Sequence, residues 1–381
     1  MDSYKSLFNL PKDKIYLNGA YMSPMPLSVM EAGERALSSK QDPTSISQED
    51  FFSGPEKLKR EFAALCNISD YSNVAIVPSV SYGMATVAKN IRAKKGGKII
   101  LAAEQFPSNV YPWQDLARQQ DLEIKIVSPP DEPIERGKRW NENILNAIDE
   151  KTTMVVIGNV HWADGTLFDL LAIRKATRPA GALLIIDGTQ SVGALPFDVQ
   201  QICPDALICA GYKWLMGPYS IGLAYYGEYF REGNPIEHNW INRYKSENFR
   251  DLVKYEHRYQ SGMTRYDMGE KSNFILVPMM LEALRFLNRT GPAAIQQYCR
   301  EISTDALNHL TEAGWWVEDP AYRTSHLFGM HPPKGIEISE ALNRLIRNNI
   351  YVSLRGSVIR VSPNIYNDRT ELNRMAEILI G

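Results

Sequence analysis

An acid and a lysine follow two apolar runs of the sequence, and together they could do chemistry on a bound aldehyde. The run Leu183–Ile186 leads to Asp187, and the run Ala206–Ala210 leads to Lys213, 26 positions after that acid. Lysine forms a Schiff base with an aldehyde, and a buried carboxylate can hold a pyridine nitrogen protonated. The pair therefore predicts a site for pyridoxal 5'-phosphate (PLP).

The elements that must position this pair alternate between apolar strands and amphipathic helices. Strands are predicted at Val74–Val77, Lys98–Ala102, Glu123–Val127, Met154–Ile157, Leu183–Asp187, Ala206–Cys209 and Ile221–Tyr226, and helices at Tyr82–Ile91, Pro112–Gln119, Asn141–Ile148 and Leu170–Thr177. Nearly continuous apolar strands separated by helices indicate a mostly parallel sheet with helices on both faces. In such sheets ligands bind outside the carboxyl ends of the strands, where Asp187 and Lys213 lie. The charged, proline-rich stretch Ser128–Arg139 is predicted to be a surface loop.

A second, smaller α/β domain is predicted toward the C-terminus. Helix patterns cover Phe274–Leu287 and Ala293–Ala313, followed by a strand pattern at Ile359–Val361 and a helix pattern at Thr370–Ile380. A chain of 381 residues is long enough for one large and one smaller core. We expect an N-terminal arm over residues 1–14 that packs with the small domain, a large PLP-binding domain over 15–270 and a small C-terminal domain over 271–381.

Composition and charge do not favour nucleic acid, a membrane or a metal as a partner of this protein. The formal net charge of −2 does not favour binding to nucleic acid or to an anionic membrane surface. The apolar runs are far shorter than the roughly 20 residues that cross a bilayer, and the N-terminus lacks an apolar signal core. Four cysteines without CxxC spacing predict buried thiols, with neither a disulfide framework nor a zinc site. We expect a cytoplasmic protein without a metal.

Further polar and aromatic residues follow other predicted strands. Ser79 or Ser81 would cap the helix that begins after Val74–Val77, and its free amides would attract a phosphate; the alternative is an ordinary serine cap. Phe106 follows the next strand and could lie flat on a pyridine ring, or it could belong to the core. His161 could act as an acid or a base, or simply make a structural hydrogen bond.

These residues and motifs resemble the class V aminotransferase group of fold-type I PLP enzymes, which also contains cysteine desulfurases, kynureninases and isopenicillin N epimerase-like proteins. The resemblance runs from about Ile15 to the C-terminus. It rests on Asp187-Gly-Thr-Gln190, on the segment Tyr212–Gly222 (Tyr-Lys-Trp-Leu-Met-Gly-Pro-Tyr-Ser-Ile-Gly) and on the segment Ile359–Asn367 (Ile-Arg-Val-Ser-Pro-Asn-Ile-Tyr-Asn).

The resemblance implies a role for each cofactor-binding position. Lys213 would be the Schiff-base lysine and the proton carrier at Cα, Asp187 would pair with the pyridinium nitrogen, and Gln190 would contact the ring hydroxyl. Phe106 would stack on the ring. The donors that hold the phosphate would be Val80, Ser81 and Tyr212.

The resemblance also implies substrate contacts and a dimer. Arg360 matches the arginine that binds the substrate α-carboxylate, a bidentate task that suits a guanidinium. His161 and Trp162 are further candidates for contact with the substrate. Gly269 and Glu270 lie in a loop that resembles the one reaching a neighbouring subunit's phosphate, so the family pattern implies a homodimer with shared sites.

Three departures from the family pattern bear on the reaction. Desulfurases of the group carry a catalytic cysteine on a loop before the C-terminal arginine, and the corresponding stretch Asn348–Ser357 contains none. Trp162 stands where many members place an asparagine against the ring hydroxyl, and Ala210 stands where many have a phosphate-binding serine. Desulfurase activity of the usual type is therefore disfavoured.

The resemblance thus implies a PLP enzyme that removes the Cα proton of an amino acid. Transamination with a keto acid as second substrate is the leading outcome. This choice rests on the name of the family more than on a physical property of the residues. A kynureninase-like reaction, prompted by Phe106 and Tyr212, is the alternative, together with other PLP lyase or epimerase reactions. A protein that binds PLP without turnover is a third possibility, against which the complete set of Lys213, Asp187 and Arg360 argues.

Overall fold

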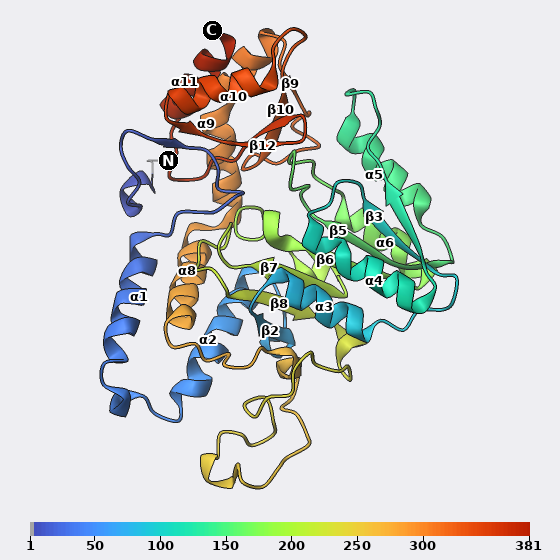
Figure 1. Cartoon of the computed structure of the whole chain (residues 1–381), viewed down its shortest axis with the longest axis vertical. Coiled ribbons are helices and arrows are strands. Elements are labelled where there is room, and N and C mark those ends of the chain that lie inside the picture. The colour runs from blue at the N-terminus through green and yellow to red at the C-terminus, as the bar shows by residue number, and fades with distance from the viewer. Residues whose placement is uncertain (1–3) are drawn as a thin grey trace.

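The computed structural model describes residues 4–381, which form a large α/β unit and a smaller one above it in the view of Figure 1. The large unit contains a seven-stranded sheet in the order β2-β8-β7-β6-β5-β3-β4. Its strands are β2 (Val74–Val77), β3 (Lys98–Ala102), β4 (Glu123–Val127), β5 (Thr152–Gly158), β6 (Leu183–Asp187), β7 (Ala206–Ala210) and β8 (Gly222–Tyr226). β8 is antiparallel to β2 and β7, and the remaining pairs are parallel. The predicted mostly parallel sheet is confirmed.

Helices cover both faces of this sheet. One face packs against α3 (Val80–Asn90) and α4 (Tyr111–Gln120), and the other against α2 (Asp50–Leu65), α5 (Arg136–Ala147), α6 (Leu170–Ala180) and α8 (Leu276–Thr290). Alternate strand residues serve the two cores, as Ile185 faces one and Ile186 the other. Both are fully buried, and burying such a side chain contributes about 1.5–3 kcal/mol.

The strand register brings the ends of β6 and β7 to one edge. Asp187 pairs with Ile208, so both strands finish within a few residues of each other on the same side of the sheet. The chain turns sharply after Asp187 because Gly188 has no side chain. A Cβ there would lie 2.6 Å from the side chain of Leu207 and 2.8 Å from Sγ of Cys209.

The smaller unit is built on an antiparallel sheet in the order β12-β13-β10-β9. Its elements are β9 (Trp316–Val317), β10 (Phe328–His331), β11 (Ile350–Tyr351), β12 (Ser353–Arg355), β13 (Val358–Val361), α9 (Pro292–Glu312), α10 (Ile338–Arg347) and α11 (Arg369–Ile380). The helices predicted at the C-terminus correspond to α8, α9 and α11, and the predicted strand to β13.

The N-terminal segment lies beside the smaller unit in Figure 1. β1 (Ile15–Tyr16) pairs in parallel with β11, and Lys5 Nζ lies 3.2 Å from Oδ2 of Asp368. Residues 1–3 of the predicted arm lie outside the described residues. α8 packs against α1 (Leu27–Ser39) and α2, so a helix from the last third of the chain lies against two N-terminal helices. The limits of the predicted domains stay a prediction.

The largest difference from the predicted boundaries is at the start of α5. The stretch Ser128–Arg139 was expected to be a loop, but α5 begins at Arg136. Tertiary contacts fix this first turn: Glu318 accepts a hydrogen bond from the amide of Gly137 over 2.7 Å, and Arg136 forms an ion pair with Asp164 over 2.8 Å. A short α7 (Val199–Ile202) also interrupts the connection between β6 and β7. No helix within residues 4–381 combines the length and the apolar character needed to cross a bilayer.

Candidate functional site

A cavity of about 220 Å³ opens at the carboxyl ends of β6 and β7. It is lined by Pro78, Ser79, Val80, Ser81, Phe106, Ser108, Trp162, Asp187, Thr189, Gln190, Ala210, Tyr212, Lys213, Tyr219, Ser220 and Ile221. Eight of the predicted site residues are among them: Val80, Ser81, Phe106, Trp162, Asp187, Gln190, Tyr212 and Lys213. The lining does not include His161, Gly269, Glu270 or Arg360.

Lys213 is the basic residue of this cavity. Its side chain is buried, with Nζ 5.2 Å from the ring centroid of Phe106 and 5.6 Å from that of Tyr212. Burial lowers the pKa of Lys213 to about 8; the charge of Asp187 opposes this shift, whereas Arg360 and Arg355 add to it. A large fraction of Lys213 is therefore a neutral, nucleophilic amine slightly above neutral pH.

Asp187 is the acidic residue of the cavity. Burial raises the pKa of its carboxyl, and a hydrogen bond from the amide of Thr189 over 3.0 Å to Oδ1 opposes the shift. Within residues 4–381, no cation lies within ion-pair distance of this carboxylate. A carboxylate so placed gains most from a cationic group that enters the cavity. Thr189 was not predicted as part of the site, although Asp-Gly-Thr after a strand is a recognisable turn sequence.

The opposite end of the cavity is the N-terminus of α3. Ser79 is the N-cap, and its Oγ accepts a hydrogen bond from the amide of Tyr82 over 3.1 Å. Of the two serines predicted as possible caps, Ser79 is therefore the one that caps the helix. Among the described residues, nothing accepts the amides of Val80 and Ser81. Free amides at the positive end of a helix dipole form an anion site, here at the edge of the cavity.

Gln190 has both ends of its side chain bonded within the protein. Nε2 donates to the backbone oxygen of Ala20 over 3.1 Å, and Oε1 accepts from Nε1 of Trp214 over 2.8 Å. These bonds fix the side chain against the N-terminal segment. The predicted contact of Gln190 with the ring hydroxyl stays a prediction.

Arg360 contacts Trp162, which lines the cavity, but does not line it itself. Its Nη1 donates to the backbone oxygen of Trp162 over 2.8 Å, and its guanidinium carbon lies 5.9 Å from the centroid of the indole. Arg360 is 1% exposed, and its Nε has no hydrogen-bond partner among the described residues. Burial and the charge of Arg355 lower the pKa of Arg360 to about 9, so it stays protonated at neutral pH. A buried cation without a carboxylate partner marks a site for an anion.

Both ring nitrogens of His161 make hydrogen bonds within the protein. Nδ1 lies 3.0 Å from Oδ1 of Asp164, and Nε2 lies 3.2 Å from the backbone oxygen of Ala103. Asp164 also pairs with Arg136; although burial alone would raise its pKa, His161 and Arg136 hold the pKa of Asp164 well below its usual range. Since both ring nitrogens are occupied, the structure does not bring His161 into contact with the cavity.

Gly269 and Glu270 lie near α3 but outside the cavity of their own chain. The amide of Gly269 donates to Oε1 of Glu237, which also accepts the hydroxyl of Tyr82 over 2.9 Å. Glu270 is exposed, with a left-handed φ of 57°. Their predicted contact with a neighbouring subunit's phosphate stays a prediction.

The residues of the cavity fit PLP. Lys213 is an amine able to hold an aldehyde, Asp187 is a carboxylate that lacks a cation, and the amides of Val80 and Ser81 offer a phosphate site. The aromatic ring of Phe106 lies 5.4 Å from that of Trp162 at the cavity wall. Within residues 4–381, no group of three histidine, cysteine or acidic side chains is arranged to hold a metal ion.

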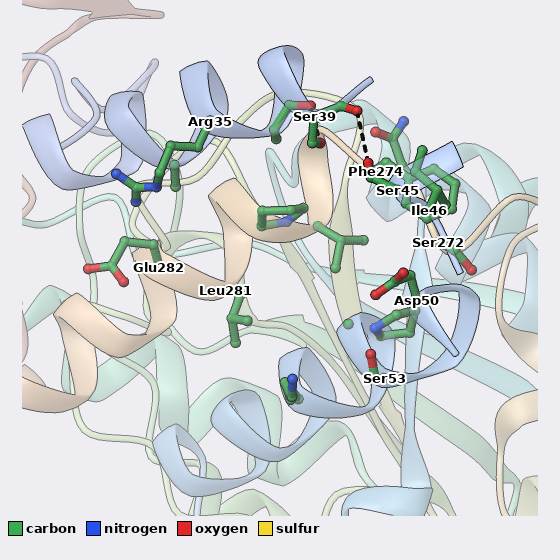
Figure 2. Close-up of a pocket in the computed structure, with 18 of the residues that line it drawn as sticks. Arg35, Ser39, Ser45, Ile46, Asp50, Ser53, Ser272, Phe274, Leu281 and Glu282 are labelled. Carbon is green, nitrogen blue, oxygen red and sulfur yellow. Dashed lines mark hydrogen bonds between the residues drawn. The ribbon is translucent and has the colours of Figure 1, made fainter. Parts of the chain in front are cut away.

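A second cavity, of about 490 Å³, lies between α1, α2 and α8 (Figure 2). Arg35, Ser39, Asp50, Ser53 and Glu282 are among the side chains at its edge. None of the predicted site residues lines it. The cavity at the strand ends is therefore the candidate site, because the lysine, the carboxylate and the anion-binding amides meet there.

Comparisons with known proteins agree on one family. The model of the class V aminotransferase family matches residues 15–375. An uncharacterized aminotransferase of Bacillus subtilis (strain 168) is 26% identical over 83% of this chain and 80% of its own length. A probable cysteine desulfurase of Pyrococcus abyssi is 29% identical over 85% of this chain and 82% of its own length. Among solved structures, a lysine-to-alanine variant of C-DES with glycine covalently linked to its PLP cofactor superimposes with a TM-score of 0.86 over 100% of this chain and 99% of its own, at 18% identity. That likeness shows a shared fold, fold type I.

Proposed function

Because the chain belongs to the class V aminotransferase family and is a PLP-dependent enzyme of amino acid chemistry, we propose that it transfers the amino group of an amino acid to a keto acid. One observation carries the proposal. Lys213, with its pKa lowered to about 8, lines one cavity with the unpaired carboxylate of Asp187, and the unpaired guanidinium of Arg360 lies behind the Trp162 wall of that cavity.

In this proposal PLP, when bound, serves as the sink for the electron pair that the Cα–H bond leaves behind. Asp187 keeps the pyridine nitrogen protonated, and the α3 amides of Val80 and Ser81 hold the phosphate together with Tyr212. Phe106 covers the ring. These residues position the reactive carbon and keep water from the face that they cover.

Arg360 and Lys213 would handle the substrate. Arg360 binds the α-carboxylate, with two donors available for a bidentate contact. Lys213, as a neutral amine, accepts the Cα proton and then delivers it. Transamination needs a single base that moves one proton between two carbons, and Lys213 is the one lysine in the cavity lining. Contact of Trp162 with the substrate belongs to the same proposal, whereas His161, which does not line the cavity, would act only by positioning the neighbouring Trp162.

Desulfurase chemistry is not part of the proposal. The stretch where such a cysteine would lie, Asn348–Ser357, contains no cysteine, and the turn between β12 and β13 consists of Gly356 and Ser357. Cys66, Cys209 and Cys299 are buried in the core, and Cys203 follows the surface helix α7. No cysteine lines the cavity. A kynureninase-like cleavage or another lyase or epimerase outcome is the alternative, because each begins with the same proton transfer to Lys213.

The assembly and location belong to the proposal as well. A homodimer is supported by the loop of Gly269 and the exposed Glu270, which lies outside the cavity of its own chain. A cytoplasmic location is in keeping with the balanced charge of the sequence.

Half-reaction spectroscopy tests the proposal. Purified holoenzyme is mixed with each amino acid, then with a panel of keto acids, and the absorbance of the cofactor and the new amino acid are followed. We expect the cofactor absorbance to be lost with the amino acid and restored by the keto acid, with a stoichiometric amino acid product. Release of alanine from kynurenine, or racemisation without keto acid, would assign the alternative reaction.

A further inference from the structure

Arg355 lies next to Arg360 on the same face of the small sheet. β12 and β13 are antiparallel, with Ser353 opposite Arg360 and Arg355 opposite Val358. Side chains alternate along a strand, so Ser353 and Arg355 share the face that carries Arg360. A distance of 3.5 Å between Nη2 of Arg360 and Oγ of Ser353 agrees with this arrangement.

Both guanidinium groups lie against the indole of Trp162. The guanidinium carbon of Arg355 is 5.5 Å from the ring centroid, and that of Arg360 is 5.9 Å from it. Trp162 also lines the cavity and contacts Phe106, above whose ring Lys213 lies. The two arginines are therefore joined to the cavity by one aromatic ring that lines it, and both are close enough to lower the pKa of Lys213.

No acidic side chain within residues 4–381 forms an ion pair with either arginine. Arg355 donates from Nη1 to the backbone oxygen of Leu354 over 2.7 Å, and its Nε is buried without a partner, like that of Arg360. The two guanidinium groups are diagonal neighbours on adjacent strands, and no described acidic side chain neutralises them. Two unpaired positive charges so close together suit a ligand with two acidic groups.

The degree of burial separates the tasks of the two arginines. Arg360 is 1% exposed and bonded to the backbone of Trp162, whereas Arg355 is partly exposed at the end of β12, next to the turn into β13. A ligand group that reaches Arg355 lies farther out than one on Arg360. In this order Arg360 would bind the α-carboxylate of a substrate, and Arg355 would bind a group at the end of its side chain.

We propose that Arg355 binds a carboxylate at the end of the substrate's side chain, so that the enzyme acts on dicarboxylic amino acids and keto acids of four or five carbons. The proposal rests on the proposed function for the assignment of the α-carboxylate to Arg360. Arg355 would thereby determine specificity. A guanidinium in a partly desolvated site binds a carboxylate favourably, whereas a substrate that ends in a methyl group makes no favourable contact with it.

Binding of unreactive acids tests this directly. The holoenzyme is titrated calorimetrically with succinate, which has two carboxylates, and with butyrate, which has one and the same chain length. We expect succinate to bind at least about tenfold more tightly than butyrate, consistent with one additional charge-assisted hydrogen-bond pair. In Arg355→Gln the difference should vanish while the affinity for butyrate stays the same, and in Arg355→Lys part of it should return.

Arg347→Gln is the matched control, since Arg347 is an exposed arginine of α10 paired with Glu340. Its affinity ratio should equal that of the wild type. Equal affinity for the two acids in the wild type, or an unchanged ratio in Arg355→Gln, would overturn the proposal. Melting temperatures confirm that each variant is folded.

Steady-state kinetics separate this inference from the proposed function. L-glutamate and L-norvaline have the same chain length, and only glutamate carries the distal carboxylate. Arg355→Gln should raise KM for glutamate by about tenfold or more and leave kcat/KM for norvaline unchanged. A wild type that transfers amine from neither amino acid would refute the proposed function, while the succinate titration would still decide the role of Arg355.

Discussion

Asp187 and Lys213 line one cavity from neighbouring strands, yet no ion pair joins them. Each still influences the other: Asp187 raises the pKa of Lys213, and Lys213 lowers that of Asp187. Burial outweighs these effects and shifts both pKa values toward the neutral forms. The two residues are thus held apart and poorly solvated, an arrangement that a cationic ring between them would stabilise.

Replacement of Asp187 by asparagine tests the charge at this position. Asp187→Asn should leave the stability of the apoprotein unchanged or higher, because it removes a partly buried carboxylate whose pKa is raised and which has no ion-pair partner. Affinity for PLP should fall roughly 10- to 100-fold, the loss of one charge-assisted hydrogen bond. Equilibrium titration with PLP and thermal unfolding measure the two effects. Asp205→Asn is the control; it breaks a 2.9 Å ion pair with Arg174 and should destabilise the apoprotein instead.

Arg360→Met separates binding from stability in the same way. A buried guanidinium without an acidic partner costs stability, so its replacement by an apolar side chain should leave the melting temperature unchanged or raise it. KM for the amino acid should rise about 100-fold or more, since a bidentate carboxylate contact is lost. Lys59→Met, which breaks the buried 2.7 Å pair with Asp267, should lower the melting temperature. Normal KM in Arg360→Met would exclude Arg360 from substrate binding.

The lowered pKa of Lys213 predicts the pH dependence of cofactor incorporation. The amine must be neutral to attack the aldehyde, so the rate at which PLP attaches to the apoenzyme should rise with pH and level off above about 8. An ordinary lysine would show this rise near pH 10.4. Stopped-flow absorbance between pH 6 and 10 measures the profile. A midpoint near 10 would mean that burial does not depress this amine.

The His161–Asp164–Arg136 cluster is predicted to support the wall of the site. Asp164→Asn should lower the free energy of unfolding by about 3–5 kcal/mol, because it leaves Arg136 without its acidic partner in a buried cluster. The folded-state pKa of Asp164 is held below its ordinary value of 3.8. The stabilisation is therefore complete above that value and declines as the pH falls below it. Glu340→Gln at an exposed pair should have little effect in the same denaturant titrations.

Much of the fold follows from local patterns in the sequence. Most strands of the large sheet are nearly continuous apolar runs, whereas the edge strand β4 (Glu123–Val127) alternates polar and apolar residues. The register of β6 and β7 brings Asp187 close to the segment that carries Lys213. The first turn of α5 was not predictable, because Glu318 and Asp164 hold it from distant parts of the chain. Propensity alone cannot report such contacts.

The residues of the site likewise divide into those that local sequence patterns predict and those that depend on contacts between distant segments. Residues at the end of a strand or a few positions beyond it, such as Asp187 and Phe106, were predicted to share the site and do line one cavity. Arg355 was missed because its significance depends on the register of β12 against β13, which places it beside Arg360. The internal bonds of His161 likewise depend on Ala103 and Asp164, which a single-residue argument does not include.

The most direct measurement is the identification of the lysine that holds the cofactor. Holoenzyme is treated with borohydride, digested, and the peptide carrying the reduced pyridoxyl group is sequenced by mass spectrometry. We expect the modified residue to be Lys213, and Lys213→Ala to give no labelled peptide and to lose at least about a thousandfold in activity. A label on another lysine, or full turnover by Lys213→Ala, would contradict it.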